Sequence, residues 1–210
     1  MATIKQGALG GFKGKLGPAV GYSWKGRACM RSMPSKYRDR KTPQQEEARQ
    51  RFAVLSRLAS QMLPAAALGL RGVAAEAMMS EMNYFMRLNK QCVTMTEGVP
   101  SIDHARLRLS EGDLPPVQFD TPQSTSARGI GVDFHDDPLA PGDGGDYVYL
   151  FAYADSMKDG ILSLPAYRYS RHIDMALPAC WTGHSLHLYG FAWDSDTRAT
   201  GTTYLGRFAP

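Results

Sequence analysis

The stretch DYVYLFAY (146–153) alternates large aromatic rings with smaller apolar residues. Successive side chains of a β-strand point to opposite faces, so the rings would share one face and the smaller residues the other. The rings are those of Tyr147, Tyr149, Phe151 and Tyr153. A strand that is apolar on both faces is typical of the interior of a sheet. The stretch therefore predicts an inner strand.

A second run, HSLHLYGFAWD (184–194), repeats this pattern with His187, Tyr189, Phe191 and Trp193 on one face. Five more segments resemble strands, and turn-forming residues separate them. They are ARLRLS (105–110), GIGVDF (129–134), ILSLPAYRY (161–169), HIDMAL (172–177) and TTYLGRF (202–208). About seven short strands of this kind favour an immunoglobulin-like β-sandwich over residues 98–210.

Residues 42–96 are predicted to form two antiparallel helices. In TPQQEEARQRF (42–52), Thr42 fits an N-cap and Pro43 fits the first helical position. An apolar stripe predicts a helix from about residue 43 to 62 that ends near Pro64. The stretch AAALGLRGVAAEAMMSEMNYFMRLN (65–89) predicts a second helix. Together with the sandwich, this segment places the chain in the α+β class.

Residues 1–41 are predicted to form a basic, glycine-rich arm that contains a β-hairpin. In VGYSWKGRACMR (20–31), Lys25 and Gly26 fit a two-residue turn, because glycine accepts the positive φ that such turns need. The turn sets the register. It places Trp24 opposite Arg27, Tyr22 opposite Cys29, and Val20 opposite Arg31, all on one face.

Charge is distributed unevenly along the chain. Residues 1–51 hold twelve lysines and arginines against three acids, a net charge of +9, whereas the remaining residues hold twelve against seventeen, a net charge of −5. A basic head can attract a polyanion, or it can bind the acidic body of a neighbouring copy. An aromatic and cationic hairpin face suits stacking on bases together with phosphate contact. In the alternative, Trp24 and Tyr22 pack on the helices.

No catalytic, metal or cofactor motif stands out in the sequence. Gly14 and Lys15 are followed by Leu16, so the Walker pattern fails. The acids at 136, 137, 143 and 146 match no EF-hand loop and are interpreted as solvated turn residues. On a strand, His184 and His187 would point to opposite faces and could not share one zinc ion. We therefore expect a non-enzymatic protein without a cofactor or metal.

Cysteine usage and hydropathy bear on the location of the protein. Cys29, Cys92 and Cys180 are far apart and form no C-x-x-C pair, which agrees with a reducing compartment. No run of eighteen apolar residues could span a membrane. The first twenty residues lack the apolar core of a secretory signal. The expected location is cytoplasmic, without a membrane partner.

The run KQGALGGFKGKLGPAVGYSWKGRACMRSMPSK (5–36), the following TPQQEEARQRF and the closing YLG (204–206) resemble an uncharacterised bacterial family. Members of this domain-of-unknown-function family begin with such a Gly/Lys run and W-K-G element. The resemblance covers the whole chain and is most specific in residues 4–52. It implies no activity and no site residues.

These observations lead to a binding or assembly protein whose arm engages a polyanion, most plausibly nucleic acid or a nucleoprotein surface. The candidate binding residues are Lys13, Lys15, Tyr22, Trp24, Lys25, Arg27, Arg31, Lys36, Arg38 and Arg40. One alternative is a structural subunit whose arm docks on the acidic sandwich of a neighbouring copy, giving a homo-oligomer. Another is a carbohydrate-binding sandwich that uses its tyrosines and tryptophans as a stacking platform.

Overall fold

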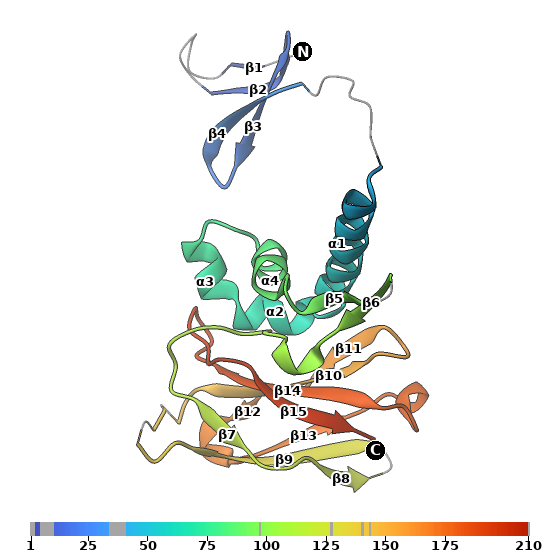
Figure 1. The fold of residues 1–210 in the computed structure, drawn as a ribbon. Helices are drawn as coiled ribbons and strands as arrows, with labels where there is room; N and C mark the ends of the chain where they lie inside the picture. Colours follow the sequence, from blue (N-terminus) through green and yellow to red (C-terminus); the bar gives the residue numbers. More distant parts are fainter. Residues whose placement is uncertain are drawn as a thin grey trace. The chain divides into compact units, whose positions relative to one another are not determined.

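The computed structural model describes residues 3–4, 11–33, 41–96, 98–126, 128–139, 141–142 and 144–209. The chain forms two compact units, residues 1–42 and residues 43–210 (Figure 1). In the described part of the chain, no helix has the length and apolar character needed to cross a bilayer. The two units are described one after the other.

The first unit is a four-stranded antiparallel sheet in the order β1-β2-β3-β4. Its strands are β1 (Thr3–Ile4), β2 (Phe12–Leu16), β3 (Ala19–Trp24) and β4 (Arg27–Ser32). The β3–β4 hairpin confirms the predicted register, with Trp24 opposite Arg27, Tyr22 opposite Cys29, and Val20 opposite Arg31. The sequence did not predict that the preceding glycine-rich segment adds β2 to this hairpin.

Two glycines allow a tight turn and a close approach in this small sheet. Lys25 and Gly26 form the β3–β4 turn with φ of 45° and 79°, the left-handed conformation that matches the twist of paired strands. Gly21 lies beneath the ring of Phe12, where an added Cβ would be 2.3 Å from the Phe12 carbonyl oxygen. Only glycine allows this close approach. Gly21 and Gly26 therefore serve the sheet itself.

The second unit begins with four helices. They are α1 (Pro43–Gln61), α2 (Leu63–Gly69), α3 (Arg71–Glu76) and α4 (Glu81–Asn89). The structure confirms the first predicted helix, but the prediction of one further helix was wrong. Leu70 leaves helical geometry between α2 and α3, and Met78 has a φ of 54°. Ser80 then caps α4 by accepting a hydrogen bond from the Asn83 amide at 3.4 Å.

The rest of this unit consists mainly of strands, in two larger antiparallel sheets and one hairpin. The hairpin joins β5 (Val93–Thr96) and β6 (Val99–Ile102). The larger sheet contains β11 (Asp159–Leu162), β10 (Tyr147–Ala154), β14 (Leu186–Trp193) and β15 (Thr203–Phe208), with β12 (Ala166–Tyr167) paired to β10. The other contains β13 (His172–Ala176), β9 (Gly129–Asp136) and β7 (Val117–Phe119), with β8 (Gln123–Ser126) paired to β9.

Three short 3₁₀ helices complete this unit: η1 (His104–Arg106), η2 (Arg168–Ser170) and η3 (Ala179–Trp181). The prediction of a strand over residues 105–110 was wrong. Its alternating leucines, Leu107 and Leu109, are buried in the core beside the helices instead. Alternation alone does not distinguish a strand from an irregular segment that buries every second side chain.

The larger sheet is the middle layer, with the helices on one face and the second sheet on the other (Figure 1). The rings of β10 and β14 lie in the core that also contains the helices. Val148, Leu150 and Ala152 lie in the core between the two sheets. Strand β10 is flanked by β11 and β14, which confirms the predicted inner strand. The predicted boundary between residues 96 and 98 falls between the paired strands β5 and β6, inside one compact unit.

Candidate functional site

One face of the N-terminal sheet carries most of the candidate binding residues. Directly paired residues of an antiparallel sheet share a side. Lys15 pairs with Val20, which pairs with Arg31, and Trp24 pairs with Arg27. Alternation along β2 and β3 adds Lys13 and Tyr22 to this side. We call this surface the basic face: Lys13, Lys15, Val20, Tyr22, Trp24, Arg27, Cys29 and Arg31.

The two rings of the basic face are exposed. Tyr22 is 42% exposed and Trp24 is 47% exposed. Within the N-terminal unit itself, neither ring is buried in a core. Strands β2, β3 and β4 contain no acidic residue, so the charges of the lysines and arginines are not offset within these strands.

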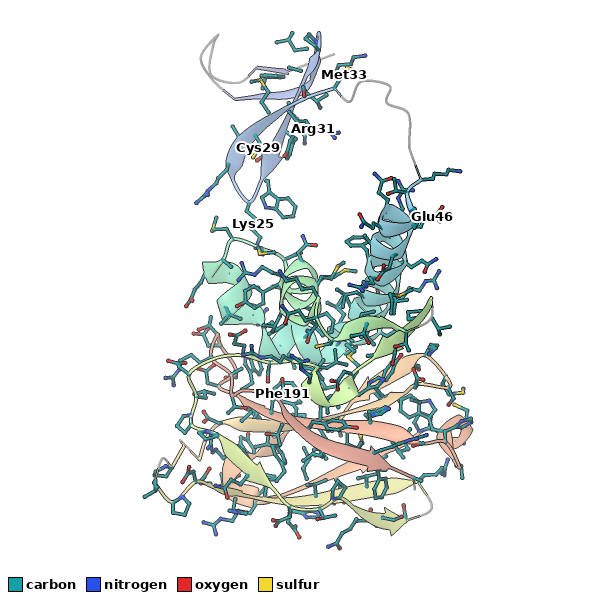
Figure 2. All side chains as sticks on the ribbon, in the orientation of Figure 1. Lys25, Cys29, Arg31, Met33, Glu46 and Phe191 are labelled. Atoms are coloured by element: carbon teal, nitrogen blue, oxygen red, sulfur yellow. The ribbon has the colours of Figure 1, made fainter. Side chains whose placement is uncertain are left out.

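The other candidate binding residues have different positions. Lys25 lies at the tip of the β3–β4 hairpin, with Cys29 and Arg31 farther along β4 (Figure 2). Lys36, Arg38 and Arg40 lie outside the described residues. The structure thus brings six candidates, from Lys13 to Arg31, to one face and places Lys25 at the adjoining turn.

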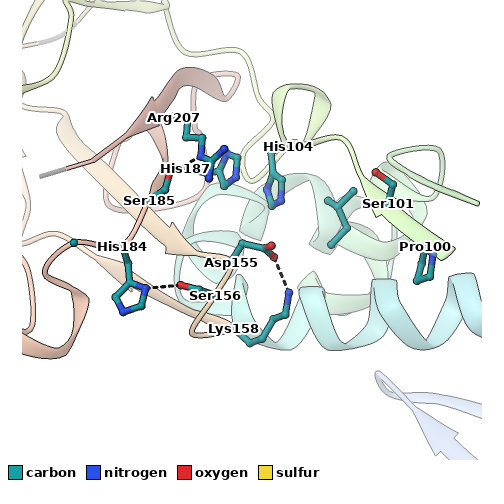
Figure 3. Close-up of a pocket in the computed structure, with 12 residues that line it drawn as sticks. Pro100, Ser101, His104, Asp155, Ser156, Lys158, His184, Ser185, His187 and Arg207 are labelled. Carbon is teal, nitrogen blue, oxygen red and sulfur yellow. Dashed lines mark hydrogen bonds and ion pairs between the residues drawn. The ribbon is translucent and has the colours of Figure 1, made fainter. Parts of the chain in front are cut away.

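A second candidate site is a cavity of about 650 Å³ in the unit formed by residues 43–210 (Figure 3). It lies where β6, η1, the β10–β11 turn, the loop before β14 and strand β15 meet. We call it the histidine cavity. Its lining residues are Pro100, Ser101, Ile102, His104, Asp155, Ser156, Lys158, Gly183, His184, Ser185, His187 and Arg207.

Two stacked imidazoles form one wall of the histidine cavity. The rings of His104 and His187 are nearly parallel, with centroids 3.7 Å apart. His104 Nδ1 lies 3.1 Å from the Tyr189 hydroxyl, and His187 Nδ1 lies 2.8 Å from the Tyr204 hydroxyl. Burial, followed by the charge of His187, lowers the pKa of His104 to about 4. Burial also lowers the pKa of His187, so both rings are neutral at neutral pH.

The opposite side of the cavity contains two polar pairs (Figure 3). Lys158 Nζ donates to Asp155 Oδ1 at 2.7 Å, and Ser156 Oγ lies 2.9 Å from His184 Nδ1. Burial raises the pKa of Asp155, but the hydrogen bond and charge of Lys158 outweigh burial and hold it below its ordinary value. Asp155 is therefore ionised and already paired.

The sequence analysis placed His184 and His187 on opposite faces of a strand, whereas both line the histidine cavity. His184 lies in the loop before β14 rather than on a strand, so alternation does not apply to it, and the prediction that His184 and His187 occupy opposite faces was wrong. Among the described residues, no three His, Cys, Asp or Glu side chains are grouped to hold a metal ion. The only sequence signal for the cavity was the presence of three histidines, at 104, 184 and 187, near apolar strands.

Two of the four acids predicted to be solvated turn residues, Asp136 and Asp146, have a different role, whereas Asp137 accepts a hydrogen bond from the Leu139 amide in a turn. Asp146 is only 5% exposed, and both Asp136 and Asp146 pair with the buried guanidinium of Arg168. Asp143 lies outside the described residues. Asp146 is therefore buried, and Asp136, about one-third exposed, pairs with the same buried guanidinium.

The family resemblance seen in the sequence is confirmed. The chain matches the model of a family of unknown function, DUF6266, over residues 11–206, and it belongs to that family. A comparison with curated proteins found no match. Among solved structures, the chain is similar to the fn3 domain of the human collagen alpha-1(XX) chain, with 12% identity, a TM-score of 0.34, and coverage of 48% of this chain and 83% of that chain. A TM-score this low does not establish a shared fold.

The histidine pair makes stability sensitive to acid. The folded chain holds His104 at a pKa of about 4, whereas an unfolded chain binds this proton near pH 6.5. The unfolded state therefore binds more protons in this window, and stability falls as pH drops from about 6.5 toward 4. We expect the melting temperature to fall less steeply in His104→Gln than in the wild type, measured by circular dichroism at intervals from pH 7.5 to 4.5.

The matched control for this experiment is His135→Gln, which removes an exposed histidine on β9. Its melting temperature should follow the wild-type pH profile. Equal slopes for His104→Gln and the wild type would show that the buried pair does not govern acid sensitivity.

Proposed function

We propose that this protein is a non-enzymatic nucleic-acid-binding protein that uses the basic face as its interface. The observation that carries the proposal is the presence of two exposed rings, Tyr22 and Trp24, on the same face as four cationic side chains. The arrangement supports a single-stranded ligand, because unpaired bases can stack on exposed rings while lysine and arginine contact phosphates. Lys25, Lys36, Arg38 and Arg40 would extend the contact along the strand.

The proposal also covers a second type of ligand, the fold and the location of the protein. A nucleoprotein surface would present the same phosphates to the basic face. We also propose that the two sheets form an immunoglobulin-like sandwich and that the protein is cytoplasmic. We propose no catalytic activity for the chain.

The salt dependence of binding tests this function. Displacement of counterions by lysine and arginine makes affinity for a single-stranded oligonucleotide fall steeply as salt rises. A flat dependence would remove the polyanion hypothesis.

Self-assembly is the second candidate, and two exposed carboxylates on the sandwich favour it. On the outer face of the second sheet, His172 Nδ1 lies 2.5 Å from Asp133 and His172 Nε2 lies 3.2 Å from Asp174. Both carboxylates are more than half exposed. A basic arm from a neighbouring copy could dock there and build a ring or filament. Light scattering at rising protein concentration tests this candidate, and a strict monomer would exclude it.

Burial leaves little support for the carbohydrate alternative. The rings of Phe151, Tyr189 and Phe191 are covered by the helices, and Trp181 is buried in the sandwich. They are not available as a stacking platform. Tyr167 and Tyr169, with nearly parallel rings 5.1 Å apart, are exposed.

A further inference from the structure

The histidine cavity contains an arginine, Arg207, that donates a hydrogen bond to a serine rather than to a carboxylate. Arg207 on β15 donates from Nε to Ser185 Oγ, and within the described part of the chain its guanidinium has no carboxylate partner. Asp155 is the carboxylate that lines the cavity, and Lys158 already neutralises it at 2.7 Å. The lining therefore has a net positive charge before any histidine is protonated.

The two stacked imidazoles also have unused nitrogens. Tyrosine hydroxyls occupy Nδ1 of His104 and of His187. Among the described residues, the Nε2 atoms of these rings have no hydrogen-bond partner. Nearly parallel rings 3.7 Å apart are poorly arranged to direct two nitrogen lone pairs at one small cation. Once protonated, the same rings can both donate hydrogen bonds from Nε2 to an acceptor that has several oxygens.

We propose that the histidine cavity binds a small ligand with a phosphate-type oxyanion, using Arg207 as a fixed charge and the His104–His187 pair as hydrogen-bond donors that gain protons when the anion enters. The cavity volume of about 650 Å³ is typical of small-molecule sites and far exceeds that of one oxyanion. The natural ligand therefore carries its oxyanion on a larger body. The hydroxyls of Ser101, Ser156 and Ser185 line the same space and can hold that body.

Proton uptake follows from the charges that face the two rings. Asp103 and Tyr189 lie beside His104; Asp155, Lys158, Arg207 and Tyr204 surround the pair. Burial and the neighbouring cations keep the rings neutral in the empty cavity. An anion supplies the opposite charge and favours the protonated rings. Binding is therefore tighter in acid. The affinity rises by up to about tenfold for each unit by which the bound anion raises the pKa of one histidine.

Sulfate is a suitable probe because its charge does not change between pH 5.5 and 7.5. Titration of the full chain at both pH values, followed by calorimetry and by the NMR signals of the histidine rings, tests the proposal. We expect saturable binding that is several-fold tighter at pH 5.5, with the His104 and His187 signals shifting toward their protonated positions. A phosphorylated sugar, added in a second titration, should bind more tightly than sulfate alone if the cavity also holds the body of the ligand.

Matched arginine variants locate the binding. Arg207→Gln should weaken sulfate binding about tenfold or more, whereas Arg128→Gln, which removes an exposed arginine on the same unit, should leave it unchanged. The Arg27→Gln variant shows whether sulfate also binds to the basic face, because its sulfate affinity would then fall. Equal affinity at both pH values, unmoved His104 and His187 signals, or an unaltered affinity in Arg207→Gln would overturn the proposal. The histidine signals of the wild type remain decisive if Arg207→Gln does not fold.

Discussion

If the basic face binds nucleic acid as proposed, we expect Trp24→Ala to lower the affinity of the full chain for a single-stranded oligonucleotide by roughly 5- to 150-fold, which corresponds to about 1–3 kcal/mol for one stacked base. The loss has a direct physical cause, because the indole is 47% exposed on a face that also carries Arg27 and Tyr22. The side chain therefore contributes little to the core of the sheet, and its removal acts mainly on binding. Fluorescence anisotropy of a labelled oligonucleotide at low salt measures the change.

Met30→Ala is the matched control for this prediction. Met30 is a large apolar residue on the same small sheet, 69% exposed, and its pairing with Gly21 places it on the face opposite Trp24. We expect its oligonucleotide affinity to stay within about twofold of the wild type. An equal loss in both variants would mean that the basic face has no special role.

Arg168→Met destabilises the chain by about 3–5 kcal/mol, because it leaves a buried carboxylate without its cation. The Arg168 side chain is fully buried and pairs with Asp136 and with Asp146, whose own side chain is almost fully buried. Its Nη2 also donates to the carbonyl oxygens of Pro115 and Pro116, at 2.9 and 3.0 Å. Urea unfolding at neutral pH, with the free energy extrapolated to water, measures the loss.

Two controls separate this buried cluster from ordinary surface pairing. Arg198→Gln removes an exposed guanidinium that pairs with the partly buried Asp194 and should cost less than about 1 kcal/mol. Replacing Asp146 by Asn in the Arg168→Met background removes the buried charge and should recover part of the stability. A loss in Arg168→Met no larger than that in Arg198→Gln would contradict the role given to the cluster.

The N-terminal hairpin could be predicted from sequence because its determinants are local. Gly26 identified the turn, the turn set the register, and the register placed Trp24 and Arg27 side by side. The inner strand β10 was also predictable, because its alternation reports burial on two faces. The addition of β2 was missed, since it depends on Phe12 covering Gly21, and glycine leaves no apolar pattern to read.

The histidine cavity could not be predicted because its residues come from four segments separated in sequence. His104 and His187 stack only after η1 packs beside β14, and Arg207 arrives on the neighbouring strand β15. Arg168 illustrates the same difficulty. A single arginine in a tyrosine-rich turn resembles a surface residue, and its burial depends on acids 32 and 22 positions away.

The salt dependence of oligonucleotide binding tests the central claim most directly. The affinity of the full chain for a labelled single strand is measured by anisotropy from about 50 to 300 mM salt. If Lys13, Lys15, Arg27 and Arg31 each contact a phosphate, the logarithm of the binding constant should fall against the logarithm of salt with a slope of roughly −3, and less steeply in Arg27→Gln. No saturable binding at low salt, or a slope near zero, would contradict the nucleic-acid account.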